Sequence, residues 1–488
     1  MSRTLPMLSD GVAPPETEAG RHEPPDDAPR DKCGVFAVSG SEAAAELTYM
    51  GLYALQHRGQ ESAGIVTIDD DGEARSHRGM GLVSEIFEDP DIRQLQGSTS
   101  VGHVRYSTAG HSAMRNAQPV LVDYRRGPLS LAHNGNLTNG LELRERLTRE
   151  GAIFQTDSDS EVIIHLISNS RREAEAQQVD DALTQVTGAF SLVLSIGDTL
   201  YAARDPRGYR PLLLGELDGA TIVASETCAL DIIGAEYVRD VQPGEVLRIR
   251  DGEVEQLRPL EPEEPAPCLF ELVYFSRPDS QIWGCSVDEA RREFGRQLAR
   301  EHPVDADCVF SVPDSANSSA LGYSEESGLP FELALIRNHY VGRTFIQPTQ
   351  AGRDFKVRMK YNVVRDRVEG QRVVVVDDSL VRGTTSRGLL SLLREAGAEE
   401  IHFRIASPPI RYPCHYGIDM PTREELLASD KSVEEIADHL GVDSLGYLSL
   451  DGMKEAVSDF GPFCDACWTG DYDAPLVDIE AGYATVGA

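Results

Sequence analysis

Short apolar runs separated by turn residues dominate the chain from residue 33 to about residue 250. Their length and their content of β-branched and aromatic residues are typical of strands. Helical spacing interrupts them at 41–56 and 159–176. Many strands with few helices predict a layered α+β domain, which we place at residues 33–262. The strand-like runs are CGVFAV, SAGIVTI, TSVGHVRYS, LSLAHNG, AFSLVLSI, TLYAAR, LLLGEL, TIVAS and EVLRIR.

Beyond this region the pattern changes, and apolar runs alternate with helical segments. A Pro- and Glu-rich stretch at 258–267 separates the two patterns, as expected of a domain boundary. The alternation predicts a parallel sheet with crossover helices, hence an α/β domain at residues 263–470. A helical pair is predicted at 422–440. The expected strands are CVFSVP, ELALI, RVVVVDD and EIHFRIASP, and the other expected helices are SSALGYSEES and TSRGLLSLLREAG.

The two ends of the chain differ from these domains in composition. Residues 1–32 are rich in Pro, Asp, Glu and Gly and have few large apolar side chains, so we expect them to be disordered. They lack the basic start and apolar run of a signal peptide, and no stretch of about 18 apolar residues predicts a membrane span. These features favour a cytoplasmic protein. Residues 471–488 are interpreted as an acidic C-terminal tail.

The charge balance excludes one class of function and indicates a habitat. Asp and Glu number 80 against 46 Lys and Arg, which gives a formal net charge of −34. Such a field repels polyanions, so we expect no nucleic-acid partner. Lysine occurs only at positions 32, 356, 360, 431 and 454. Strong acidity with so little lysine favours a halophilic protein from a salt-loaded cytoplasm.

The stretch QRVVVVDDSLVRGTTSRGLLSLLREAG, at 371–397, combines a buried strand, a short loop and a helix. Gly383, Thr384 and Thr385 fall where the helix begins, and backbone N–H groups at a helix N-terminus bind anions. Asp377 and Asp378 end the strand, where open α/β sheets hold their ligands. A paired Asp beside a phosphate loop suits ribose hydroxyls and Mg²⁺. The Walker pattern is absent, and an ordinary strand, turn and helix with solvated carboxylates is the alternative.

VVVVDDSLVRGTTS resembles the phosphoribosyl pyrophosphate signature of the type I phosphoribosyltransferases. The resemblance implies that Asp377 and Asp378 hold the ribose hydroxyls and Mg²⁺, and that Ser315 also reaches the metal. Residue 316 is Ala where that family usually has Gly, so the local turn is in question. Basic residues between 340 and 360 suggest a loop that closes over pyrophosphate. Further substrate residues implied are Arg343, Lys360, Ser379, Arg382, Gly383, Thr384 and Thr385.

The first domain resembles the class II glutamine amidotransferases, which are N-terminal-nucleophile hydrolases of αββα layers. The segments that carry the resemblance are CGVFAV, LYALQHRGQESAGI, GHVRYSTAG, AHNGNLTN and TDSDSEV. In that family the catalytic cysteine is the first residue of the mature chain, which here would be Cys33. Its thiol would use its own α-amine, of pKa roughly 8, as base, so residues 1–32 would be a cleaved propeptide.

The same resemblance assigns the other glutaminase residues. Asn134 and Gly135 would form the oxyanion hole, Arg105 would bind the α-carboxylate of glutamine, and Asp159 would bind its α-ammonium. Thr108 would add a hydrogen bond. An internal Cys and His pair that uses one of the nearby histidines is the rival arrangement. Those histidines are His103, His111 and His133.

Eight cysteines are scattered too widely for the disulfide frame of a small secreted domain. Cys464 and Cys467 in CDAC form a chelating pair, and Cys268 and Cys414 supply two more thiolates, a set that suits zinc or an iron–sulfur cluster. Their contexts resemble the cluster-bearing branch of the amidophosphoribosyltransferases, which implies a structural [4Fe-4S] cluster, with zinc as the alternative. Core roles are expected for Cys228, Cys285 and Cys308.

Taken together, residues 33 to about 470 resemble the amidophosphoribosyltransferase family over nearly the whole chain. The resemblance implies transfer of the glutamine amide nitrogen to phosphoribosyl pyrophosphate, the first step of purine synthesis. It also implies a homotetramer that is inhibited by purine nucleotides. Two alternatives are a class II amidotransferase with another acceptor and a non-catalytic regulator that senses phosphoribosyl pyrophosphate and binds DNA.

Overall fold

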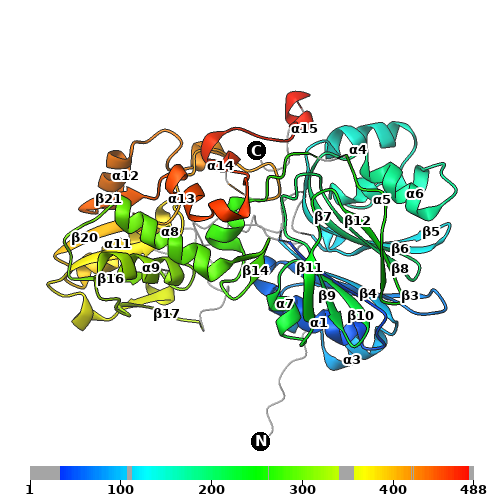
Figure 1. Cartoon of the computed structure of the whole chain (residues 1–488), viewed down its shortest axis with the longest axis horizontal. Coiled ribbons are helices and arrows are strands. Elements are labelled where there is room, and N and C mark those ends of the chain that lie inside the picture. The colour runs from blue at the N-terminus through cyan, green and yellow to red at the C-terminus, as the bar shows by residue number, and fades with distance from the viewer. Residues whose placement is uncertain are drawn as a thin grey trace, which may run out of the picture.

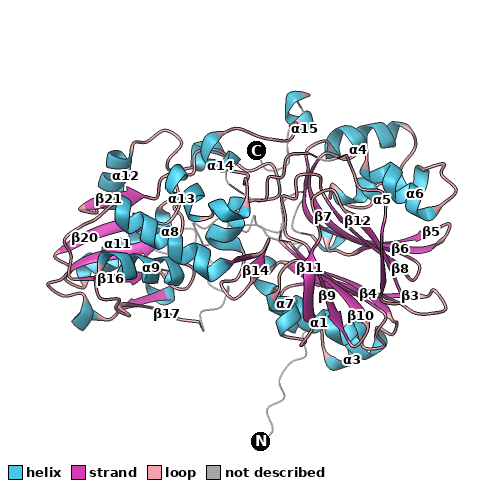
Figure 2. Ribbon diagram, viewed as in Figure 1, coloured by secondary structure: helices cyan, strands magenta, loops and turns pink. Residues whose placement is uncertain are grey.

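The computed structural model describes residues 33–106, 113–261, 263–339, 357–418, 420 and 422–482. These residues form two halves that lie side by side, with the N-terminal half at the right of Figure 1 and the C-terminal half at the left. Figure 2 shows that stacked sheets fill the first half and that helices surround a sheet in the second. No helix within the described residues has both the length and the apolar character needed to cross a membrane.

The first half contains two antiparallel sheets, ordered β11-β9-β10-β1-β4-β2-β3 and β13-β12-β8-β7-β6-β5. The strands are β1 (Gly34–Ser39), β2 (Ser62–Ile68), β3 (Ala74–Met80), β4 (Thr99–Arg105), β5 (Val120–Tyr124), β6 (Gly127–Leu137), β7 (Gly188–Ile196), β8 (Thr199–Arg204), β9 (Leu213–Leu217), β10 (Ala220–Ala224), β11 (Glu236–Asp240), β12 (Val246–Arg250) and β13 (Glu253–Gln256). All nine strand-like runs of the sequence are confirmed as strands.

Helices cover the outer face of each sheet, so the first half has the expected αββα layers. Along β1, Phe36 and Val38 pack towards the outer helices, whereas Val35 and Ala37 join the core between the sheets. Because both faces of β1 are buried, its sequence is a nearly continuous run of apolar residues. The helices are α1 (Ala44–Ala54), α2 (Val83–Ile86), α3 (Asp89–Gln94), α4 (Gly140–Arg149), α5 (Ser160–Asn169), α6 (Glu175–Leu183) and α7 (Cys228–Asp231).

The second half is built on a parallel sheet of order β16-β19-β20-β21, as the alternating pattern predicted. Its strands are β16 (Cys308–Ser311), β19 (Arg372–Asp377), β20 (Glu400–Ile405) and β21 (Ser444–Tyr447). Two antiparallel pairs form separate small sheets: β14 (Gln281–Ile282) pairs with β15 (Cys285–Ser286), and β17 (Leu335–Arg337) pairs with β18 (Tyr361–Val363). Its helices are α8 (Val287–Glu301), α9 (Asn317–Ser327), α11 (Thr384–Glu395), α12 (Val433–Leu440), α13 (Leu450–Ala456) and α14 (Ala466–Thr469).

The helical pair expected at 422–440 is wrong in its first member. Only a short 3₁₀ turn, Arg423–Glu425, forms there, and α12 begins after Ser432, whose side chain caps it. The reason is tertiary: the backbone N–H of Leu427 donates to the carbonyl of Val381 at 2.8 Å, so this segment packs against the loop between β19 and α11 instead of forming a helix. Helix α8 was missed, because its apolar stripe is narrow among many charged residues.

The C-terminal segment crosses back to the first half. Helix α15 (Val477–Glu480) lies beside α4 in Figure 1. The carboxylate of Asp478 accepts the N–H groups of Leu141 and Glu142, both at 2.9 Å, in the first turn of α4. A carboxylate at this end of a helix satisfies free backbone donors. The expected acidic tail is therefore anchored at Ala474 and Asp478, which are buried, and residues 483–488 lie outside the described residues.

We expect Gly295→Ala in α8 to lower the free energy of unfolding by about 1–3 kcal/mol. A Cβ at residue 295 would lie 1.9 Å from the carbonyl oxygen of Ser319 in α9, so the two helices would have to separate. Urea unfolding measures the effect. Gly388→Ala is the matched control, because the atoms nearest to a Cβ there are side-chain carbons of Val357, at 3.1 Å or more. We expect it to be nearly neutral; equal losses would contradict the packing argument.

Candidate active sites

Cys33 lies directly before β1, at the end of the seven-stranded sheet. The pairing of Gly34 with Val104 places it beside the last residues of β4, and its Sγ donates to the carbonyl of Tyr106 at 3.7 Å. The residue is only 6% exposed. Its own carbonyl accepts a hydrogen bond of 3.0 Å from Nε of Arg58. Strand ends and one arginine therefore fix this thiol at the edge of the sheet.

Asn134 and Gly135 lie on β6 of the other sheet, near the same edge. His103 of β4 bonds the carbonyl of His133 at 3.0 Å, which holds this part of β6 against the end of β4. The Asn134 side chain is buried, and its Nδ2 has no hydrogen-bond partner among the described residues. A buried amide donor without a partner is costly unless a ligand completes it. Gly135 has φ of 149°, and a Cβ there would lie 2.1 Å from the carbonyl of Ala189.

Two of the expected glutamine-binding residues flank this edge. Arg105, at the end of β4, is 3% exposed and pairs with Glu61 at 2.9 Å. Asp159 precedes α5, and its Oδ2 accepts the N–H of Leu137 at 2.8 Å, so it sits beside β6. Thr108 lies outside the described residues. The structure thus brings Cys33, Arg105, Asn134, Gly135 and Asp159 to one region of the first half.

The rival Cys and His pair finds no support in the described residues. Burial lowers the pKa of His103 to about 3, and its ring bonds the carbonyl of His133 instead of Cys33. His133 directs its two ring nitrogens to Ser160 Oγ at 3.0 Å and to the carbonyl of Ala189 at 3.2 Å. His111 lies outside the described residues.

The second candidate site lies at the carboxyl end of β19. Asp377 ends the strand, and its Oδ1 accepts the N–H of Asp378 at 3.0 Å. The hydroxyl of Ser379 donates to Asp378 Oδ1 at 2.6 Å. Gly383, with φ of 76°, then turns the chain into α11, which begins at Thr384. The two aspartates and the start of α11 therefore flank one short loop, residues 379–383.

The structure describes most, but not all, of the other residues expected at this site. Because β16 runs parallel to β19, the loop that carries Ser315 leaves the sheet at the same edge. Ala316 has an ordinary φ of −87°, so alanine strains nothing at the position in question. Lys360 Nζ lies 5.2 Å from the ring centre of Tyr361, and Arg382 pairs with Glu425 at 3.4 Å. Arg343 lies outside the described residues.

Four cysteines from distant parts of the chain gather between α14 and the start of the second half. Cys268 and Cys464 form a β-bridge, and Cys414 Sγ accepts the N–H of Tyr416 at 3.3 Å. Burial raises the pKa of Cys467, and the nearby thiols of Cys268, Cys414 and Cys464 raise it further. None of the four is in a disulfide. No group of three or more potential ligands in the described residues converges closely enough to hold a single metal ion.

The remaining cysteines behave as expected. Cys228, Cys285 and Cys308 are buried and belong to three separate apolar cores. Burial raises the pKa of Cys285 to about 11, so this thiol stays protonated.

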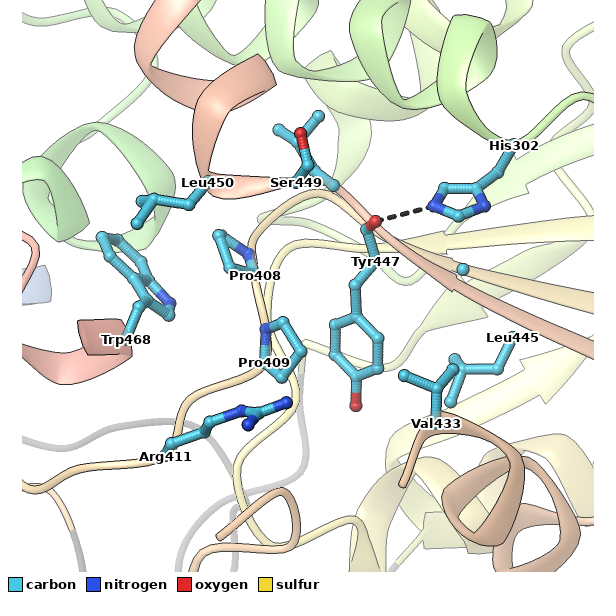
Figure 3. A pocket seen from close by; sticks show the side chains of 12 residues that line it. His302, Pro408, Pro409, Arg411, Val433, Leu445, Tyr447, Ser449, Leu450 and Trp468 are labelled. Carbon is cyan, nitrogen blue, oxygen red and sulfur yellow. Dashed lines mark hydrogen bonds between the residues drawn. The ribbon is translucent and has the colours of Figure 1, made fainter. Parts of the chain in front are cut away.

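A cavity of about 340 Å³ lies beyond the ends of β20 and β21, among Pro409, Tyr447, Leu450 and Trp468 (Figure 3). His302 Nε2 and the carbonyl of Tyr447 are 2.8 Å apart at its rim. None of the expected site residues lines it.

Sequence reasoning missed a group of buried charges at the junction of the two halves. Arg58, Arg210, Glu226 and Glu271 have side chains no more than 2% exposed. The carboxylates of Glu271 and Glu226 raise the pKa of Arg58 although its burial alone would lower it. Burial alone would raise the pKa of Glu271, but Arg58 and Arg210 lower it. All four groups are therefore charged at neutral pH. A charged residue in a sequence gives no signal that it will be buried.

Comparisons with known proteins agree with both halves. A family model described as a glutamine amidotransferase domain matches residues 103–231. A relative from Arabidopsis thaliana, named "Amidophosphoribosyltransferase 1, chloroplastic", is 49% identical and covers 98% of this chain and 87% of its own. The amidophosphoribosyltransferase of Bacillus subtilis is 48% identical over 91% of this chain and 95% of its own. The chain belongs to the amidophosphoribosyltransferase family.

Solved structures extend this agreement to the fold. The glutamine phosphoribosylpyrophosphate amidotransferase of B. subtilis complexed with ADP and GMP is 48% identical, with a TM-score of 0.86 over 91% of this chain and 98% of that one. A structure described as the allosteric regulatory enzyme of purine biosynthesis gives a TM-score of 0.87. The chain is thus an enzyme that transfers the glutamine amide nitrogen to phosphoribosyl pyrophosphate, the first step of purine synthesis. Because the matches span both halves, neither another acceptor nor a non-catalytic regulator fits.

We expect Asn134→Ala to lower glutamine-dependent kcat by about 10²–10³, equivalent to about 2.7–4 kcal/mol, because an oxyanion donor is the role that the sequence predicts for its Nδ2. Synthesis from added ammonia is the internal control and should be unchanged. Asn139→Ala, two residues beyond the same strand, is the matched variant, since its Nδ2 is already engaged by the carbonyl of Gln185 at 2.9 Å within the first half. Equal loss in both variants would contradict the oxyanion role.

Proposed function

We propose that a glutaminase domain at residues 33–262 supplies ammonia to a phosphoribosyltransferase domain at 263–470. One observation carries this division: the buried Cys33 thiol lies at the same end of the two stacked sheets as the buried Asn134 Nδ2, which has no partner among the described residues, whereas Asp377 and Asp378 lie in the other half. A nucleophile next to an open donor suits acyl transfer. Paired carboxylates at a helix start suit a phosphorylated sugar.

In the proposed glutaminase reaction, removal of residues 1–32 frees the α-amine of Cys33. That amine accepts the thiol proton, and the thiolate attacks the amide carbon. The α-ammonium then returns the proton to the amide nitrogen, so that ammonia leaves when the tetrahedral intermediate collapses to a thioester. Asn134 Nδ2 and the N–H of Gly135 stabilise the oxyanion. Arg105 and Asp159 hold the α-carboxylate and α-ammonium, and Thr108 adds a hydrogen bond. Water then hydrolyses the thioester to release glutamate.

In the proposed synthase reaction, ammonia attacks C1 of the ribose and pyrophosphate leaves. Asp377, Asp378 and Ser315 are oxygen ligands at one sheet edge, a set that suits Mg²⁺, which would neutralise charge on the pyrophosphate. The loop from Ser379 to Thr385 cradles the 5′-phosphate, and Arg343 and Lys360 bind the leaving pyrophosphate. Basic residues are concentrated between 340 and 360 in an otherwise acidic sequence, and this concentration supports a role in binding an anion.

We further propose a structural [4Fe-4S] cluster on Cys268, Cys414, Cys464 and Cys467. The donor set fits: the four thiols are mutually close, and none is oxidised to a disulfide. Cysteine thiolates are the usual ligands of such clusters. The cluster would cross-link three segments of the chain. Zinc on the same thiols is the alternative.

Three other features of the enzyme are proposed from its relatives and composition. A solved relative is complexed with ADP and GMP, so purine nucleotides are proposed as inhibitors of this enzyme. We also propose that the enzyme is a homotetramer and that it is located in the cytoplasm. The net charge of −34 supports a halophilic setting, since a high salt concentration screens self-repulsion.

A reciprocal pair of variants tests the division of labour. Cys33→Ala should abolish glutamine-dependent pyrophosphate release and leave ammonia-dependent release unchanged, because it removes only the nucleophile. Asp378→Asn should impair release with either nitrogen source. Equal loss of both activities in Cys33→Ala would contradict the proposal, and so would an active wild-type enzyme whose intact mass still includes residues 1–32.

For the cluster, we expect anaerobically purified enzyme to contain about four irons per chain and to be brown. Cys414→Ser should lower iron content and thermal stability in parallel, because one ligand of a cross-link is lost. Cys285→Ser is the control outside the site and should retain iron. Colourless, active enzyme with stoichiometric zinc would identify zinc instead.

A further inference from the structure

The buried charges at the junction connect the second half directly to Cys33. Glu271 is the member of the group that the second half contributes, on the π-helical turn Glu271–Phe275. Its Oε1 lies 2.7 Å from Nη2 of Arg58, and its Oε2 lies 3.0 Å from Nη1. The same Arg58 donates its Nε to the carbonyl of Cys33 at 3.0 Å. A fully buried guanidinium therefore bridges a carboxylate of one domain and the nucleophile of the other.

The geometry leaves the guanidinium little freedom. Glu271 binds it in bidentate fashion, and Glu226 of the first half accepts a further bond of 2.5 Å from Nη1. Bidentate pairs fix orientation as well as distance. Glu271 is in turn held by Arg210 at 3.1 Å and by the hydroxyl of Ser276 at 3.0 Å. Nε can then point only towards the carbonyl of Cys33.

The bond from Arg58 to the carbonyl of Cys33 matters most if Cys33 becomes the first residue of the chain. Once residues 1–32 are removed, no peptide bond restrains Cys33 on its amino side. Its α-amine and thiol must stay available for chemistry, so its carbonyl is the group by which it can be held. A terminal residue frays unless it is tied down. The bond from Arg58 supplies that tie, and the carboxylate of Glu271 sets its direction.

A second contact from the other domain reaches the opposite side of the site. Asn136 Nδ2 donates to the carbonyl of His415, and a Cβ on Gly417 would lie 2.8 Å from the carbonyl carbon of Gly135. The loop around Cys414 is therefore packed on the oxyanion strand. Both elements of the glutaminase site rest on the second domain.

We infer that Glu271, in the phosphoribosyltransferase domain, is a positioning residue for the glutaminase reaction, acting on Cys33 through Arg58. The inference rests on the proposal that Cys33 is the nucleophile. The glutamine site is then incomplete in the first domain alone, and its reactivity depends on how the two domains are docked.

The test is the rate at which a diazo-ketone analogue of glutamine alkylates Cys33 in the processed full-length enzyme, followed by intact mass. Glu271→Gln keeps the size of the side chain but removes its charge. We expect its alkylation rate to fall at least tenfold and its ammonia-dependent synthesis to stay within twofold of wild type. Glu271→Asp, which restores the charge, should recover part of the rate. A purely structural role would lower both activities together.

Glu245→Gln is the matched control. Glu245 is also a buried carboxylate bound by an arginine in bidentate fashion, at 2.7 and 2.9 Å from Arg239, but this pair lies before β12 and outside the group that holds Cys33. Its alkylation rate should stay within twofold of wild type. If Glu271→Gln does not fold, Ser276→Ala removes one bond to the carboxylate and should lower the alkylation rate alone.

Alkylation of Glu271→Gln at the wild-type rate would overturn the inference while leaving Cys33 as nucleophile. Wild-type enzyme that is not alkylated at Cys33 would overturn the nucleophile assignment, and this inference with it.

Discussion

The ion pair between Arg58 and Glu271 is the contact on which the arrangement of the two domains depends. The side chains of both residues are 0% exposed, and they come from different halves of the chain. A buried charge that loses its partner costs several kcal/mol, and Glu271 takes its cationic partners, Arg58 and Arg210, from the first half, so the second half cannot bury this carboxylate alone. Docking must therefore bring a carboxylate to a guanidinium within hydrogen-bond distance. That requirement fixes where the second domain sits relative to Cys33.

The same junction gathers most of the chemistry of the first domain. The segment that carries Glu271 begins just after Cys268, and the loop that touches Gly135 follows Cys414. A metal centre that ties Cys268 to Cys414 would hold both supports of the glutaminase site at once. This gives a physical reason for a structural cluster in an enzyme whose reaction transfers no electrons. The C-terminal segment adds a further tie, since Asp478 caps α4 of the first domain.

The sequence predicted the parts of the fold and site that depend on local pattern. Four valines followed by Asp377 and Asp378 could only be a buried strand with carboxylates at its end, and Gly383 marked the turn into α11. Cys33, Asn134 and Asp159 were predicted as site residues because they sit in motifs. Arg58 and Glu271 lie 213 residues apart, and nothing in either segment signals that they are paired. The 3₁₀ turn at 423–425 was mistaken for a helix because the bond from Leu427 to Val381, just after the turn, is also long-range.

A double-mutant cycle between Arg58 and Glu271 tests the central claim most directly. The free energy of unfolding and the glutamine-dependent rate would be measured for Arg58→Met, Glu271→Gln and the double variant. If the pair acts as one unit, each single change should cause most of the loss, and the double variant should fall short of the sum by more than about 1 kcal/mol in both quantities. Additive losses would show that Arg58 and Glu271 act independently, and would contradict the account.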